Sequence, residues 1–223
     1  MKRVIKNQPP SSFLEYINSK NKEDSNYKPT YEGIDDKQGL KKALYDEQGG
    51  ICGYCQIKIS LEKMKVEHHC EQSICNGKDG SIDKSLDYTN LLAVCLGKFG
   101  TNETSCDTKK SEFNSNNGLP IEVSPWNISH MDAIKYTSNG NIISNIHRHN
   151  IELNEILNLN SRHLKDLRSK KFNTIFKESR HLSASISKLK MKKILEKDLD
   201  YCVKPYSNSF PGLSEYMLKK FCR

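Results

Sequence analysis

Two cysteines separated by two residues, Cys52 and Cys55 in the sequence CGYC, constrain the fold of this chain more than any other feature. Two thiolates at this spacing can point at one metal ion from a tight loop, and two such pairs make a tetrahedral zinc site. A lone CxxC pair is also found in redox folds, so it is weak evidence by itself. The prediction of zinc therefore depends on where a second pair of ligands lies.

The second pair could be Cys70 with Cys75 or Cys95 with Cys106. We favour Cys95 and Cys106, because the apolar run NLLAVC that ends at Cys95 is typical of a buried strand or helix. The sequence CDTKKS that begins at Cys106 is typical of a helix start, and the stretch between them is typical of a loop. Four thiolates leave no open position on zinc, so we expect a structural site. Cys70 and Cys75 are then expected to be small side chains in a loop.

Composition guides the interpretation of the remaining cysteines. The chain has 223 residues and a formal net charge of +8, which favours a polyanionic partner. No apolar stretch approaches the roughly 20 residues of a membrane span, and no apolar segment follows the basic start MKRVIKNQPP as in a secretory signal. We therefore expect a cytoplasmic protein, in which spaced cysteines bind metal or react more often than they form disulfides. Cys202 and Cys222 are expected to be packing residues.

Turn signals and periodicity predict several elements. A helix is expected over residues 36–48, where a pair of glycines follows the last periodic residue. The alternating sequence IKYTSNGNIIS predicts a β-hairpin around Asn139-Gly140. Beyond His147 the sequence is typical of basic helices, and no linker separates it from the cysteine-rich stretch. We therefore expect both to share one compact unit.

Glu67 and His68, in the sequence VEHH, directly follow the strand-like KMKV. Neighbouring residues on an extended segment point to opposite faces, so one can bind a metal while the other faces a different part of a site. Histidine can accept a proton from water near neutral pH, and a divalent metal can stabilise charge on a phosphate. The alternative is that His68 and His69 are surface residues or neighbours of the zinc site.

The order of these motifs resembles that of the HNH, or ββα-metal, nucleases that carry zinc knuckles. The chain reads CGYC, VEHH, DYTNLLAVC and CDTKKS in that order. More closely, LYDEQGGICGYCQ and the three later motifs resemble the HNH nucleases of Septu-type antiphage defence, the PtuB group, which are also found beside some retrons. LNEILNLNSRHLKDLR and SEYMLKKF are similar to the helical tail of that group, so the resemblance extends from about Lys41 onward.

The resemblance implies an α+β fold, with a zinc-knuckle-stabilised ββα-metal (HNH) core and flanking, mainly C-terminal, α-helices. Residues 1–35, which precede the resemblance, are expected to form a polar N-terminal segment that is available for contact with a partner. Residues 36–130 would form the HNH nuclease core with its structural zinc at Cys52, Cys55, Cys95 and Cys106. Residues 131–223 would contain the β-hairpin followed by the basic helical region.

Matching positions to the family implies a role for each polar residue. His68 would be the general base that activates water, and Glu67 and Asp107 would hold a catalytic Mg²⁺ or Mn²⁺. Asn90 would orient the loop that bears His68 or contact the metal. Asp107 replaces the final histidine of the family, and its oxygen suits Mg²⁺ better. The chain lacks the proline that follows the histidine in the family, so His69 is the alternative base.

Lysines near this set suggest contacts with phosphate. Lys110 lies three residues after Asp107, so on a helix it shares the same face, and Lys109 is its neighbour. Basic residues recur beyond Arg162, and with a nuclease motif they favour a phosphate-contacting surface. The alternative for all of these lysines is a solvated helix face.

Two classes of function follow. The first is a metal-dependent endonuclease that hydrolyses phosphodiester bonds in nucleic acid, with DNA favoured and RNA such as tRNA as the alternative. The resemblance places it as the effector of a Septu-type antiphage system, with a PtuA-like ATPase that has an ABC or SMC-like head. The second is a zinc-stabilised nucleic-acid-binding or adaptor module that cuts nothing. We favour the first, because a binding module has no use for the catalytic set.

The end of the chain offers a candidate surface for that ATPase. On a helix that begins near Leu213, the residues Leu213, Tyr216 and Met217 form an apolar stripe at i, i+3 and i+4. Such a stripe suits a groove on a partner. The alternative is that the stripe folds back onto the core of the protein itself.

Overall fold

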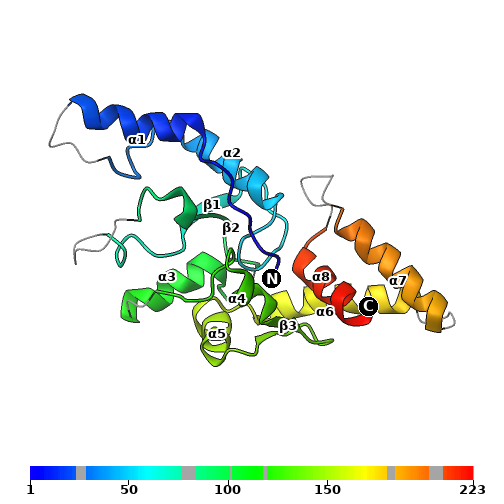
Figure 1. Cartoon of the computed structure of the whole chain (residues 1–223). Coiled ribbons are helices and arrows are strands. Elements are labelled where there is room, and N and C mark those ends of the chain that lie inside the picture. Colours follow the sequence, from blue (N-terminus) through cyan, green and yellow to red (C-terminus); the bar gives the residue numbers. More distant parts are fainter. Residues whose placement is uncertain are drawn as a thin grey trace.

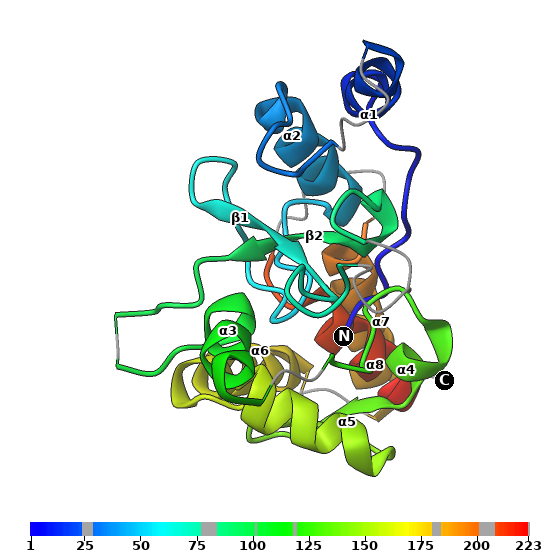
Figure 2. The same ribbon diagram turned by 90° about the vertical axis from the view of Figure 1, so that its left-hand side faces the viewer.

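In the computed structural model, the described residues form a mixture of helices and two small sheets, an α+β structure (Figure 1). Helices α1 and α2 lie at one end of the molecule and α6, α7 and α8 at the other, with the first sheet between them (Figures 1 and 2). The model describes residues 1–23, 29–76, 84–100, 102–117, 120–179, 184–200 and 208–222.

The first sheet and the helix after it form a ββα unit at the centre of the molecule. Strand β1 (Met64–His68) pairs antiparallel with β2 (Leu91–Cys95), so that Glu67 lies opposite Leu92. Every residue of β2 is buried, as expected for its continuous apolar sequence. Helix α3 (Cys106–Asn117) packs against β2 and lies below the sheet of β1 and β2 in both views (Figures 1 and 2).

Helix α2 (Lys37–Gln48) confirms the helix predicted over residues 36–48. The side chain of Asp36 accepts a hydrogen bond at the N-terminus, and Gly49 adopts a left-handed conformation with φ of 67° at the C-terminus. Gln48 ends the helix with a buried amide that both donates to and accepts from the backbone of Ala93 on β2. This pair of hydrogen bonds fixes α2 against the sheet just before the CGYC turn.

The N-terminal segment contributes to the same hydrophobic core. Val4 and, on helix α1 (Ser11–Glu23), Phe13 and Tyr16 are buried in it. A buried ion pair between Lys6 and Glu47 of α2, with a separation of 2.7 Å, joins the segment to the body of the protein. One continuous core therefore includes residues from the first to the last part of the chain.

The remainder of the described chain is mainly helical, as predicted beyond His147. No described helix combines the length and the apolar character that crossing a membrane requires. The helices after the ββα unit are α4 (Ile128–Asp132), α5 (His147–Ile151), a π-helical turn (Glu152–Ile156), α6 (Arg162–Ser179), α7 (Ala184–Asp198) and α8 (Pro211–Phe221).

The predicted β-hairpin is confirmed, with strands β3 (Ile134–Tyr136) and β4 (Ile142–Ser144) on either side of the Asn-Gly turn. Gly140 has φ of 82°, and a Cβ there would lie 2.0 Å from the carbonyl oxygen of Lys165. Arg168 on α6 is buried and donates to the carbonyl of Gly140 at 2.7 Å. Glycine is therefore needed both for the turn and for the close approach of α6.

The apolar stripe near the C-terminus belongs to the core. Leu213 and Met217 on α8 are fully buried, and Tyr216 packs edge-on against Tyr136 of β3. Helix α8 lies against α7 and β3. The expectation that this stripe docks a partner is therefore wrong, because the side chains that would fill a partner's groove already fill the protein's own core.

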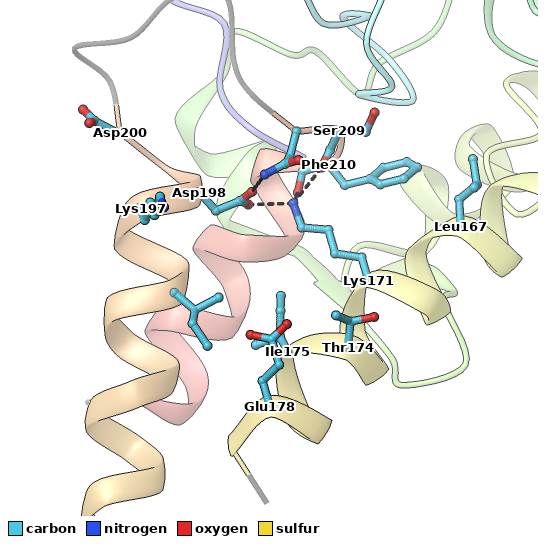
Figure 3. Close-up of a pocket in the computed structure, with 12 residues that line it drawn as sticks. Leu167, Lys171, Thr174, Ile175, Glu178, Lys197, Asp198, Asp200, Ser209 and Phe210 are labelled. Carbon is cyan, nitrogen blue, oxygen red and sulfur yellow. Dashed lines mark hydrogen bonds and ion pairs between the residues drawn. The ribbon is translucent and has the colours of Figure 1, made fainter.

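A hollow of about 760 Å³ lies between α6 and α7. Figure 3 shows Lys171 of α6 reaching across it toward Asp198 of α7. Its ammonium group donates at 2.6 Å both to Asp198 and to the carbonyl oxygen of Ser209, just before α8. These contacts join three C-terminal helices, and no predicted catalytic residue lines the hollow.

Candidate functional site

Four buried cysteines meet where the CGYC turn, the end of β2 and the start of α3 come together. The Sγ atoms of Cys52, Cys55, Cys95 and Cys106 all lie within 4.8 Å of one another. The Sγ–Sγ distances from Cys95 to Cys55 and to Cys106 are both 3.7 Å, and that between Cys52 and Cys106 is 3.9 Å. A tetrahedron with Zn–S bonds of about 2.3 Å has sulfur–sulfur edges of about 3.8 Å. The cluster therefore has the dimensions of a zinc site, with the second pair that the sequence favours.

The backbone around this cluster supports the same conclusion. Gly97, two residues after Cys95, has φ of 68°, and a Cβ there would lie 2.2 Å from the carbonyl oxygen of Ser105. The close approach of these two turns is what brings Cys106 back to Cys95. Burial raises the pKa of the Cys55 and Cys106 thiols, so a cation is needed to hold them as thiolates at neutral pH.

His68 ends β1 with its ring partly exposed. Its Nε2 atom lies 2.9 Å from the carbonyl oxygen of Ser85. A carbonyl can only accept, so this shorter contact favours the tautomer in which Nε2 carries the proton and Nδ1 keeps its lone pair, while the Gln72 amide nitrogen lies further from Nε2, at 3.3 Å. The ring of Tyr31 contacts His68 edge-on at 4.7 Å and limits its rotation. Burial lowers the pKa of His68, so the ring is neutral near pH 7 and can accept a proton.

Asn90 fastens the chain that follows His68. Its amide oxygen accepts from the N–H of Cys70 at 2.8 Å, and its amide nitrogen donates to the carbonyl of Cys70 at 2.9 Å. A third hydrogen bond, of 3.1 Å, runs to the carbonyl of Lys84. The side chain therefore holds the chain two residues after His68, and its role in orienting the base stays a prediction. Contact with a metal remains a prediction.

Glu67 and Asp107 bring two carboxylates together across β1 and α3. Burial raises the pKa of Glu67 to about 8, the charge of Lys110 opposes this, and a hydrogen bond with Asp107 adds to the rise. The pKa of Asp107 is lowered. Burial alone would raise this pKa, but hydrogen bonds from Glu67 and Lys65 outweigh the effect of burial. The pKa values of the two groups are thus shifted in opposite directions, and a divalent cation bound between them would allow both to be carboxylates.

Lys110 does not face solvent, contrary to the expectation that it contacts a phosphate. Its side chain is fully buried, forms an ion pair with Glu67 and donates to the carbonyl oxygens of His68 and His69, at 2.8 and 3.1 Å. The lysine stabilises the end of β1 from within the protein. The neighbouring Lys109 is partly exposed and lies 3.8 Å from Glu112, so its contact with phosphate remains a prediction.

His69, the alternative base, is buried behind the strand. The Tyr54 hydroxyl lies 3.3 Å from its Nδ1 atom, and Trp126 contacts its ring edge-on at 4.8 Å. Burial lowers the pKa of His69 to about 3, so the ring stays neutral. Of the two histidines, His68 is the more accessible to a substrate.

Tyr54 is a residue of the site that the sequence did not single out. It lies inside the CGYC turn, and its hydroxyl donates to Glu67 at 3.1 Å. One side chain thus connects the cysteine cluster to the carboxylates. The sequence did contain one signal for this residue, because Tyr54 lies between the predicted zinc ligands Cys52 and Cys55.

The cysteines outside the cluster differ from the expectation. Cys70 and Cys75 form a disulfide, which corrects the prediction that they are unpaired side chains in a loop. The bridge joins two residues five positions apart, and Asn90 holds the backbone of Cys70 at one end of it. Cys222 is a free, partly buried thiol, and Cys202 lies outside the described residues.

Comparison with known proteins gives two relatives. The chain is 30% identical over 157 residues to "Retron Vc95 putative HNH endonuclease" of Vibrio cholerae serotype O1 biovar El Tor, a match that covers 66% of this chain and 73% of the relative. It is 33% identical over 90 residues to "Retron Ec83 putative HNH endonuclease" of Escherichia coli, where the match covers 36% of this chain and 34% of the relative. No protein-family model matches the chain.

Proposed function

We propose, since the chain belongs to the HNH endonuclease family, that it is a metal-dependent endonuclease that hydrolyses phosphodiester bonds in nucleic acid. The observation that carries this proposal is the environment of His68. Its Nε2–H is held by the Ser85 carbonyl and its Nδ1 is left as a base. Burial lowers the pKa of His68, and the charge of Asp107 on α3 is close enough to act in the opposite direction and raise it.

In the proposed reaction, His68 Nδ1 removes a proton from a water molecule whose oxygen attacks the phosphorus. The bond from phosphorus to the leaving oxygen breaks, and that oxygen takes a proton from solvent. The Ser85 carbonyl stabilises the imidazolium that forms, as an acceptor at Nε2 does for other histidine bases. Asn90 keeps the histidine in place by holding the backbone of Cys70.

The donor set fits a divalent cation. Glu67 and Asp107 would hold Mg²⁺ or Mn²⁺, since both ions prefer carboxylate oxygens. The bound ion supplies positive charge to the phosphate and to the leaving oxygen. Lys110 is buried and contacts both Glu67 and the carbonyl of His68. With the cation bound, its ammonium group would balance the negative charge that remains on the two carboxylates.

We further propose that DNA is the substrate and that the protein acts in a Septu-type antiphage system with a PtuA-like ATPase. The sequence resemblance to the PtuB group supports this, and both relatives are named for retrons. The net charge of +8 supports a nucleic acid as the substrate. Residues other than the buried stripe on α8 would make the contact with the ATPase.

A cation titration tests the proposal. Zinc-loaded protein is incubated with DNA and, separately, with tRNA, at increasing Mg²⁺, and the rate of strand cleavage is measured together with the zinc content. Asp107→Asn should need much more Mg²⁺ than the wild type, while Glu112→Gln, a change of an exposed carboxylate on the same helix, should not. Cleavage by Asp107→Asn with the wild-type dependence on Mg²⁺ contradicts the assignment.

A further inference from the structure

A second cluster of metal-ligating side chains lies away from the ββα unit. One ligand atom each from Glu122, His130 and His149 can be chosen so that all three lie within 4.8 Å of one another. Glu122 precedes α4, His130 lies on α4 and His149 on α5. We propose that these three residues form a second metal site, which binds a divalent transition metal of the zinc type.

The strongest evidence is His149, whose side chain is fully buried. Neither of its ring nitrogens has a hydrogen-bond partner among the residues that the structure describes. Its nearest polar contact is Glu122, with Nε2 and Oε1 separated by 3.7 Å. A buried polar group left without a partner costs on the order of 1–3 kcal/mol, so such groups call for an explanation. A metal bound between His149 and Glu122 provides one.

The distances suit a metal of this type. Ligand atoms at about 2.1 Å from zinc in a tetrahedron are about 3.4 Å apart, close to the 3.7 Å between His149 and Glu122. The rings of His130 and His149 contact each other edge-on with their centroids 4.6 Å apart. Imidazole and carboxylate ligands suit zinc and neighbouring metals, and three protein ligands leave the fourth position for water.

The surrounding backbone places the ligands in advance. The buried carboxylate of Glu152, one turn after His149, accepts from the N–H groups of Glu122 and Val123 at 3.0 and 2.7 Å. This fixes the Glu122 segment against the helix that carries His149. Asn127 accepts from the N–H of His130 at 3.3 Å and caps α4, which fixes the second histidine.

The ligands also leave a route for metal to enter. The side chain of Glu122 is 57% exposed, so the cluster opens to solvent on that side. His130 Nδ1 accepts a hydrogen bond of 3.2 Å from the N–H of Ser124, so the ring can coordinate through Nε2 with that bond kept, or through Nδ1 in exchange for it. The cluster lacks the cysteine sulfurs of the first site, so the two sites differ in their ligand chemistry.

Metal analysis tests the proposal without any need for activity. The protein and its variants are equilibrated with Zn²⁺, dialysed, and analysed for zinc per chain, with circular dichroism to confirm the fold. His149→Gln is expected to hold one zinc fewer than the wild type. The matched control is His147→Gln, an exposed histidine on the same helix, which should keep the wild-type zinc content.

The result that overturns the proposal is a folded His149→Gln protein with the full zinc content of the wild type. If His149→Gln does not fold, the double variant Glu122→Gln with His130→Gln decides, because neither side chain is fully buried. Loss of one zinc per chain in the folded double variant supports the site, and unchanged zinc content overturns it. The cysteine cluster keeps its metal in every case.

Discussion

Replacing Asn90 by alanine tests how the structure positions His68. The change removes three hydrogen bonds and leaves the N–H and the carbonyl of Cys70 without their side-chain partner. Cys70 is buried, with 8% of its surface exposed, so water does not fully replace the lost partner. At about 1–3 kcal/mol for each of these two orphaned groups, we expect Asn90→Ala to lower the free energy of unfolding by roughly 2–6 kcal/mol.

Urea unfolding of the zinc-loaded protein, followed by circular dichroism, measures this change. The control is Thr89→Ala, because Thr89 is exposed and its hydroxyl donates to the nearby Asp87. Its effect should stay within about 0.5 kcal/mol. If Asn90→Ala destabilises the protein no more than Thr89→Ala does, the loop is not held as described. Retention of full cleavage activity by Asn90→Ala would refute the link between this clamp and His68.

Three further predictions concern the metal ligands and the base. Cys106→Ser should lose the structural zinc and most of the cooperative unfolding transition, because the sulfur bridges β2 and α3; full zinc content in a folded variant contradicts this. Lys110→Met should destabilise the protein by about 3 kcal/mol or more, at about 1–3 kcal/mol per group, because it leaves Glu67 and the carbonyls of His68 and His69 buried without their donor; a stability within 1 kcal/mol of wild type, measured in urea, would exclude these buried contacts. Burial lowers the pKa of His68 below its ordinary 6.5, so the acid limb of log kcat/KM against pH should have its midpoint below 6.5, and a midpoint above 6.5 contradicts a neutral base.

Short-range signals in the sequence predicted the local structure well. The glycine after α2 and the Asn-Gly turn between β3 and β4 were found because each depends on backbone conformations that few residues adopt. The pairing of CGYC with Cys95 and Cys106 followed from the apolar run that ends at one and the helix that begins at the other. Each of these local signals is encoded within about ten neighbouring residues, although the cysteine pairing that they led to joins positions up to 54 residues apart.

Features that depend on tertiary packing were not predictable in the same way. Helical spacing placed Lys110 on the face of Asp107, but could not show that this face packs onto β1 and buries the lysine. The periodicity of α8 showed an apolar stripe without showing whether the protein itself covers it. The disulfide between Cys70 and Cys75 was missed because the expected reducing compartment argued against it.

The Glu122, His130 and His149 cluster gave no signal in the sequence at all. Its residues are spread over three segments, and no spacing motif relates them. Only the fold, through Glu152 and the cap of α4, brings them together. Clusters of this kind can be found only after the structure is known.

The central claim is that His68, and not His69, is the base of a nuclease. It is tested most directly by single-turnover cleavage of nucleic acid in Mg²⁺ with His68→Ala and His69→Ala, each checked for zinc content and fold. His68→Ala should lose about 10²–10⁴-fold in rate with its zinc and its thermal stability unchanged. His69→Ala should lose stability, because the ring fills the space between Tyr54 and Trp126, yet keep measurable cleavage. An active His68→Ala beside an inactive, folded His69→Ala would contradict the account.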